Sequence, residues 1–197
     1  MRRHGRLPET SMTDAERPSP PARRGAALRM VRLAALAGAA MLVAGACPLA
    51  AAEPKSVAFL GVQFLNDHES LEPTTDAERA RLAAIEALFR QKLEASGRYA
   101  FAALPAATAA KVAEGPTFGS CGGCEFRYGA EAHADLATWL VVQKVSNLIL
   151  NINVYIVDVA TRKIILVHSV DIRGNTDESW TRGINYLIKN YVLADPR

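Results

Sequence analysis

Apolar and polar residues alternate along the chain with two different periods, and each change of period marks a predicted element. Residues 56–66 form a nearly continuous apolar run, which is typical of a strand buried on both faces. A helix is predicted to begin at the capping box of Thr75 and Glu78 and to end near Ser96. Its apolar positions recur at helical spacing and predict a core-facing stripe: Leu82, Ile85, Phe89 and Leu93.

The middle of the chain predicts short elements with breaks between them. Residues 98–104 are predicted to form a second strand, and an Ala-rich helix follows over 105–114. Gly115 and Pro116 end that helix, because both residues break helices. A loop with two cysteines comes next, and a short helix is expected over 124–133.

The last third of the chain predicts three strands in quick succession and a closing helix. Short turns separate the strands, as in an antiparallel meander: 136–146, 149–159 and 163–171. Residues 176–193 predict the helix, whose start Asn175 and Glu178 can cap. One face of this helix carries its apolar residues: Trp180, Ile184, Leu187 and Tyr191.

The resulting order of elements is β-α-β-α-α-β-β-β-α. It indicates a single α/β domain with one mixed sheet, arranged in two or three layers. The β-α-β part should be parallel, because a helix connects its two strands. The last three strands should form a C-terminal antiparallel meander, because their connections are short.

The N-terminal part has the composition of a leader. Residues 1–29 are rich in Pro and Arg without a hydrophobic period, so we expect a disordered or misassigned start. Residues 30–52 combine arginines, a short apolar stretch and small residues near the end, which predicts a signal peptide cleaved before Glu53. The folded domain is then 53–197, in the periplasm. The alternatives are an uncleaved anchor and lipidation of Cys47, which would attach the protein to the membrane.

Removing the leader reverses the net charge. The whole chain is formally +3, but residues 53–197 hold 15 basic and 17 acidic residues. The basic surplus belongs to the leader, so nucleic acid is not an expected partner. The sequence contains no G-x-S-x-G elbow, phosphate loop or dinucleotide fingerprint, and we therefore expect neither an enzyme nor a cofactor.

One motif is a candidate for redox chemistry or metal binding, because Cys121 and Cys124 are separated by two glycines. In an oxidising compartment, an even number of cysteines in the mature chain favours a disulfide that shapes the loop. A redox pair is an alternative, since a C-x-x-C at a helix start can stabilise a thiolate. A metal site is a second alternative, in which Cys121, Cys124 and His133 would be three ligands. A structural zinc is usually bound by four. We predict the structural disulfide and no metal.

Polar residues on the meander predict a second candidate site. Asn151 and Asn153 alternate with apolar residues along one strand, so they share one face of the sheet. With polar residues of the adjoining segments they form what we term the polar seam: Gln143, Asn147, Asn151, Asn153, Arg173, Asn175 and Asp177. The polar seam is either a groove for a ligand or partner, or a solvated sheet face with a helix cap.

Three segments resemble an uncharacterised family of secreted proteobacterial proteins: CGGC at 121–124, VQKVSNLILNIN at 142–153 and DIRGNTDESW at 171–180. The order of elements is similar to the N-terminal domain of TolB and to CsgG-like domains. Their turn pattern matches Asp158, Thr161 and Lys163, although Arg162 stands where Gly is common. The resemblance implies a periplasmic protein of this fold and an association with pyrroloquinoline-quinone-dependent alcohol oxidation.

These observations predict a non-catalytic accessory or protein-interaction domain, whose partner is another periplasmic or envelope protein. One alternative is a thiol–disulfide or electron-transfer helper that uses Cys121 and Cys124. Another is a carrier of a small ligand. The sequence leaves the oligomeric state open.

Overall fold

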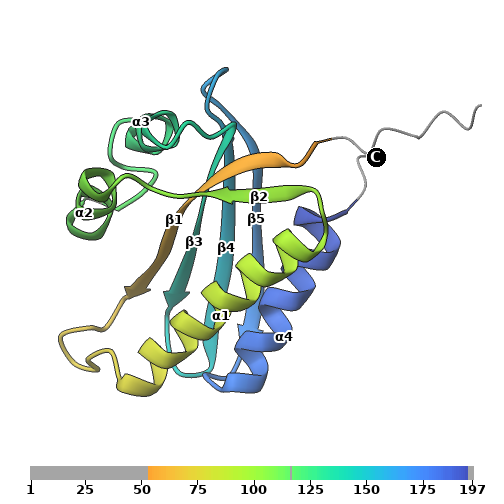
Figure 1. Cartoon of the computed structure of the whole chain (residues 1–197). Coiled ribbons are helices and arrows are strands. Elements are labelled where there is room, and N and C mark those ends of the chain that lie inside the picture. Colours follow the sequence, from red (N-terminus) through yellow and green to blue (C-terminus); the bar gives the residue numbers. More distant parts are fainter. Residues whose placement is uncertain (1–52, 116, 195–197) are drawn as a thin grey trace, which may run out of the picture. The chain divides into compact units, whose positions relative to one another are not determined.

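The fold is built on a five-stranded mixed sheet with the strand order β2-β1-β3-β4-β5 (Figure 1). The computed structural model describes residues 53–115 and 117–194, so the predicted leader, signal peptide and Cys47 lie outside the described residues. The strands are β1 Lys55–Asn66, β2 Tyr99–Ala102, β3 Leu136–Lys144, β4 Ile149–Asp158 and β5 Lys163–Arg173. The helices are α1 Asp76–Ala95, α2 Ala106–Glu114, α3 Cys124–Glu131 and α4 Asp177–Leu187, which continues as the π-helical turn η1 Ile188–Val192.

The pairing of the strands confirms the predicted fold class. β1 lies parallel to both β2 and β3, and β3, β4 and β5 form an antiparallel meander. The parallel connections contain helices, whereas the antiparallel ones are short turns, as loop length requires. The observed order of elements is the one that the hydrophobic pattern predicts.

Helices cover the two faces of the sheet unequally (Figure 1). α1 and α4 lie side by side over one face, where the larger core contains Phe59, Phe89, Leu140, Ile152 and Trp180. On the other face, α3 and its preceding loop pack over β1 and β3 in a smaller core around Leu60, Tyr128 and Trp139. The part of this second face formed by β5 and the start of β4 has exposed side chains.

Helix α1 confirms the predicted cap and stripe. The Thr75 hydroxyl accepts from the Glu78 amide at 3.2 Å, and the Glu78 carboxylate accepts from the Thr75 amide at 2.8 Å. Ile85, Phe89 and Leu93 are buried. Reciprocal capping fixes where the helix begins, and the apolar stripe then sets the face it turns to the sheet.

Helix α4 corrects two predictions. Its N-cap is Thr176, whose hydroxyl accepts from the Ser179 amide, rather than Asn175. The predicted apolar face is correct for Trp180, Ile184 and Leu187, but the wide turn of η1 then buries Val192 and leaves Tyr191 half-buried against His168. A π turn advances the helix face by an extra residue, which a regular period of 3.6 does not anticipate.

Two positions show how the backbone permits these contacts. Gly183 lets α4 approach β5, because an added Cβ would overlap the side chain of Ile172.

In the turn between β4 and β5, the Asp158 carboxylate accepts from the amide and hydroxyl of Thr161. Arg162 follows with φ of 55°, the left-handed conformation that glycine adopts most readily. The turn therefore has the geometry of a glycine-containing turn, with an arginine in that place.

None of the helices within residues 53–115 and 117–194 has both the length and the apolar character needed to cross a bilayer.

Candidate functional site

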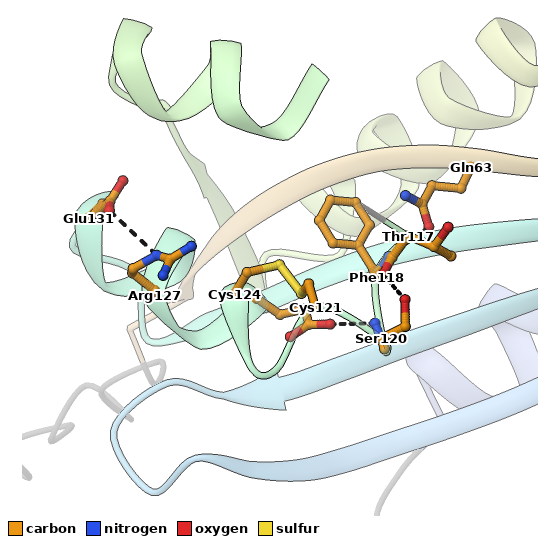
Figure 2. The surroundings of a disulfide bond; sticks show 10 residues. Gln63, Thr117, Phe118, Ser120, Cys121, Cys124, Arg127 and Glu131 are labelled. Atoms are coloured by element: carbon orange, nitrogen blue, oxygen red, sulfur yellow. Dashed lines mark hydrogen bonds and ion pairs between the residues drawn. A yellow bond between two sulfur atoms is a disulfide. The ribbon is translucent and has the colours of Figure 1, made fainter. Parts of the chain in front are cut away.

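The predicted disulfide is present between Cys121 and Cys124, with Cα atoms 5.5 Å apart (Figure 2). It closes a loop of four residues, in which Gly122 and Gly123 have φ of 66° and 89°. Cys124 is the first residue of α3, so the bond fixes the position where this helix begins. Cys124 is buried in the smaller core, whereas Cys121 is half-buried.

The disulfide loop is also anchored to the sheet (Figure 2). The Phe118 amide donates to Oε1 of Gln63 at 3.0 Å, and the Phe118 ring packs against Trp139 with centroids 5.7 Å apart. The Gly119 amide donates to the buried carboxylate of Glu125. These contacts fix the loop at Phe118 and Gly119 and pack the Phe118 ring against the sheet. A rigid, anchored loop is what we expect where a disulfide has a structural role.

A metal site would need the same sulfurs. Among the described residues, the group of ligand types close enough to hold an ion is Cys121, Cys124 and Glu125. Both sulfurs are joined in the disulfide, and the Glu125 carboxylate already accepts a hydrogen bond. His133, the third ligand considered from the sequence, is not a member of this group.

The polar seam does not form one site, because the sheet divides it. Gln143, Asn151 and Asn153 point to the face opposite α1 and α4, since their neighbours in sequence lie in the larger core. The Asn153 amide donates to the Val141 carbonyl at 3.2 Å and to Oδ1 of Asn151 at 2.6 Å. The Asn153 amide nitrogen is therefore already engaged, and the Gln143 amide donates to Asp67 at 3.4 Å.

The other amides of the polar seam lie around a buried ion pair at the carboxyl ends of β1 and β3. The Lys144 ammonium donates to Oε1 of Glu78 at 2.8 Å, and the two side chains are only 4% and 1% exposed. Asn175 donates to the same oxygen at 2.7 Å and to Asn147 at 3.1 Å. We call these four residues the Glu78 network.

The Glu78 network is closed by residues at the starts of α1 and α4. Arg81 donates to Oδ1 of Asn175 at 3.1 Å and to Asp177 at 2.6 Å. The Trp180 indole N–H donates to the same amide oxygen of Asn175 at 3.0 Å. Asn175 therefore uses both ends of its amide to join the two helices to the sheet.

The electrostatics of Glu78 reflect these donors. Burial raises the pKa of its carboxyl group, but hydrogen bonds from Lys144, the Thr75 amide and Asn175 outweigh burial and lower the pKa to about 2. The carboxylate is therefore fully ionised at neutral pH, and its oxygens are already occupied. This arrangement stabilises the end of the sheet and offers no free group for acid–base chemistry.

Sequence reasoning missed Glu78 and Lys144 as a pair. Glu78 has a sufficient local explanation as the third residue of a capping box. The residue that could have revealed this pair is Lys144. It ends a strand whose other residues are almost all buried, LATWLVVQ. A charged residue at such a position needs a buried partner of opposite charge.

Arg173 is separate from both groups. Its side chain makes no hydrogen bond or ion pair with the residues that the structure describes. It lines a cavity of about 340 Å³ between β5 and α4, together with Asp171, Arg182 and Tyr186. Asp177 borders a different, smaller cavity of about 230 Å³ between α1 and α4. The two charged ends of the polar seam therefore do not share a cavity.

Beside the disulfide, the molecule presents an uncovered sheet surface that we call the open face. Strand alternation places its members on the side away from α1 and α4: Leu65, Gln143, Ile149, Asn151, Asn153, Ile164, Val167, Ser169, Asp171 and Arg173. Four of these are apolar, and their exposed fractions are 37% for Leu65, 46% for Ile149, 60% for Ile164 and 49% for Val167. The open face therefore mixes exposed aliphatic side chains with amides.

Comparison with protein families gives a match over most of the described chain. A family model described as a protein of unknown function (DUF2380) matches residues 55–192, which include every strand and helix of the described residues. No curated protein matches the sequence.

Solved structures give distant similarities. The C-terminal domain of LpoB from Salmonella enterica is 12% identical with a TM-score of 0.43, covering 63% of this chain and 86% of its own. Lipoprotein GNA1162 from Neisseria meningitidis is 15% identical with a TM-score of 0.43, covering 70% and 98%. TolB from Acinetobacter baumannii is 11% identical with a TM-score of 0.37, covering 70% and 28%.

Proposed function

Because the chain belongs to the family described as a protein of unknown function (DUF2380), we propose its role from its own geometry: a non-catalytic protein-interaction domain. The observation that supports this proposal is the open face, where four aliphatic side chains remain exposed on a regular sheet surface. Leu65 and Ile149 lie toward one end of the open face and Val167 and Ile164 toward the other. Exposed apolar side chains gathered on one face of a domain are typical of a surface that another molecule covers.

A protein partner fits the shape of the open face. Small-molecule sites are concave and enclose most of their ligand, whereas protein interfaces use broad surfaces with an apolar centre and a polar rim. Ile149 is followed on the same face of β4 by Asn151 and Asn153, and Val167 lies on the adjacent strand β5 opposite Tyr155. This mixture suits an interface in which the aliphatic side chains make the apolar contacts and the amides form part of the polar rim.

The disulfide supports a location outside the cytoplasm. Disulfides persist in oxidising compartments such as the periplasm and are rare where thiols are kept reduced. We therefore propose that the domain acts in the periplasm, where its partner is a periplasmic or envelope protein. The association with quinone-dependent alcohol oxidation, the thiol–disulfide role and the small-ligand carrier stay predictions from the sequence.

Site-specific crosslinking tests the proposed function. A photoreactive amino acid is placed at Val167 on the open face or, as the control, at the exposed Ala87 on α1, and the protein is irradiated in its native cells. We expect a discrete adduct of one mass from position 167 that Ile149→Lys removes, and none from position 87. Equal adducts at the two positions, or none at Val167, would contradict an interface on the open face.

A further inference from the structure

Exposed apolar side chains gather where β1 and β3 end, in the lower part of Figure 1. Nine large hydrophobic residues are exposed in the described chain, and five of them lie in this region, which we call the apolar end: Leu65, Leu71, Val145, Leu148 and Ile149. Leu71 and Leu148 are the most exposed of the nine, at 82% and 72%, and both lie in loops. A folded domain thus presents its most exposed aliphatic side chains together.

Polar contacts join the two segments that carry the apolar end, the β1–α1 loop and the turn after β3. The Asp67 amide donates to the Lys144 carbonyl at 3.1 Å. The Asn147 side chain donates to the Glu72 carboxylate at 3.4 Å, and the Lys144 ammonium lies 3.6 Å from the same carboxylate. The loop and the turn therefore form one surface.

The apolar end continues the open face past the ends of the strands. Leu65 and Ile149 belong to both surfaces, and the Val145 amide donates to the Ile149 carbonyl at 3.1 Å, which places these two residues side by side. Exposed apolar side chains gathered in this way are typical of a surface that another molecule covers. A partner that lies on the open face can therefore extend over the loops at this end.

Most charged residues around the apolar end balance each other. Four ion pairs join residues at the starts of α1 and α4 and the end of β3: Glu78–Lys144, Asp76–Arg79, Asp177–Arg81 and Glu178–Arg182. On β5, Asp171 and Arg173 lie two residues apart on the same face, so their charges offset each other. Lys144 approaches Glu72 as well as Glu78, but one ammonium balances only one of two carboxylates.

The negative charge that remains lies on the β1–α1 loop. Residues 66–75 contain three acids and no Lys or Arg. Within the described residues, the carboxylates of Asp67 and Glu69 accept hydrogen bonds from neutral donors only. They border a hollow of about 610 Å³ whose walls include Phe64 and Leu65. A Lys or Arg side chain suits such a hollow, because its stem can lie on apolar surface while its charge reaches the carboxylates.

We propose that the apolar end binds a segment of a partner protein that combines aliphatic residues with Lys or Arg. The aliphatic residues contact Leu71 and Leu148, and a basic side chain enters the hollow beside Asp67 and Glu69. This inference rests on the proposed function, because it specifies the part of the partner that meets this end of the open face. A second copy of the chain fits less well, since it would bring two acidic loops together, and an anionic lipid surface would be repelled likewise.

Crosslinking followed by titration tests the inference. A photoreactive amino acid replaces Leu148, the protein is irradiated in its native cells, and the partner segment in the adduct is sequenced by mass spectrometry. We expect a segment with more Lys and Arg than Asp and Glu. The same segment is then synthesised and titrated against the purified, disulfide-intact wild-type protein.

Charge removal shows whether the loop selects this segment. Asp67→Asn combined with Glu69→Gln keeps the shapes of both side chains and should weaken binding of the synthetic segment at least about fivefold, because it removes the attraction between opposite charges. The matched control is Glu94→Gln with Glu114→Gln, which removes two exposed acids on the last turns of α1 and α2 and should leave binding unchanged.

Four results would overturn the inference. They are no adduct at Leu148, an adduct of two copies of the chain, a partner segment without a surplus of Lys and Arg, and equal affinity of the wild type and the charge-removed variant. Flotation with phosphatidylglycerol vesicles that Leu71→Ser and Leu148→Ser abolish would assign the end to lipid instead. An adduct at Val167 without one at Leu148 would refute this inference and leave the proposed function standing.

Discussion

Glu78→Gln should destabilise the protein by about 3 kcal/mol at neutral pH. The change keeps the shape of the side chain and removes the negative charge that pairs with Lys144 at 2.8 Å. The difference between the ordinary pKa of 4.5 and the value of about 2 corresponds to about 3 kcal/mol of favourable interaction with the ionised form. Removing one partner of a buried ion pair costs a similar amount, about 3–5 kcal/mol, because the other charge stays buried.

The lowered pKa of Glu78 determines how the free energy of unfolding depends on pH. A carboxyl group whose pKa is lowered by folding stabilises the folded state above its unfolded pKa, and this stability is lost as the pH falls. The contribution of Glu78 should therefore be complete at pH 7 and should fade between about pH 5 and pH 2. The glutamine side chain of the variant does not titrate, so the two unfolding free energies should converge as the pH is lowered.

Urea unfolding of both proteins from pH 7 to pH 2.5 measures this difference, provided that unfolding is two-state. Three other carboxyl groups with lowered pKa values do not depend on Glu78 and cancel in the comparison: Glu131, Asp135 and Asp158. The pKa of Glu69 is lowered mainly by hydrogen bonds to Thr74, and the Glu78 charge raises it only as the smallest contribution. Glu178→Gln, which breaks the exposed pair with Arg182, is the control and should cost less than about 1 kcal/mol. A cost for Glu78→Gln near that of the control, unchanged with pH, would refute the reasoning.

Three further predictions concern the loop, a helix contact and a turn. Replacing Cys121 and Cys124 by Ser should lower the free energy of unfolding by up to about 2 kcal/mol, and hydrogen exchange should speed up mainly in the loop; global loss of structure would contradict a local staple. Gly183→Ala should cost about 1–3 kcal/mol in urea unfolding, because the new methyl group overlaps Ile172; an unchanged midpoint would show that α4 can shift freely. Arg162→Gly should stay within about 1 kcal/mol of the wild type, whereas Arg162→Val should cost more, because a β-branched residue resists a φ of 55°; equal thermal midpoints would disprove the left-handed turn.

The fold was predictable because the decisive signals were local. A buried run at 56–66, a capped amphipathic helix after it and three closely spaced strands leave few ways to arrange a sheet. The disulfide was predictable for the same reason, since Cys121 and Cys124 lie three positions apart.

The candidate site was harder to predict because its contacts are long-range. Glu78 meets Lys144 across 66 positions and Asn175 across 97. Local rules assigned both Glu78 and Asn175 to helix caps, which was right for Glu78 and wrong for Asn175. The sequence predicts one continuous polar seam. In the structure the seam is divided, because Asn147 lies in the turn after β3 and away from the open face.

The Glu78 network has a consequence for the time at which the domain can fold. Its members come from the first helix, the third strand and the junction before α4, so a growing chain lacks Asn175 until most of it has been made. Before then the Glu78 carboxylate and the Lys144 ammonium must be desolvated without their amide partner, and the larger core lacks Trp180 and Ile184. Contacts between distant segments also form slowly. Folding is thereby deferred until the chain is nearly complete, which is compatible with the proposed periplasmic location, because an exported chain crosses the membrane before it folds.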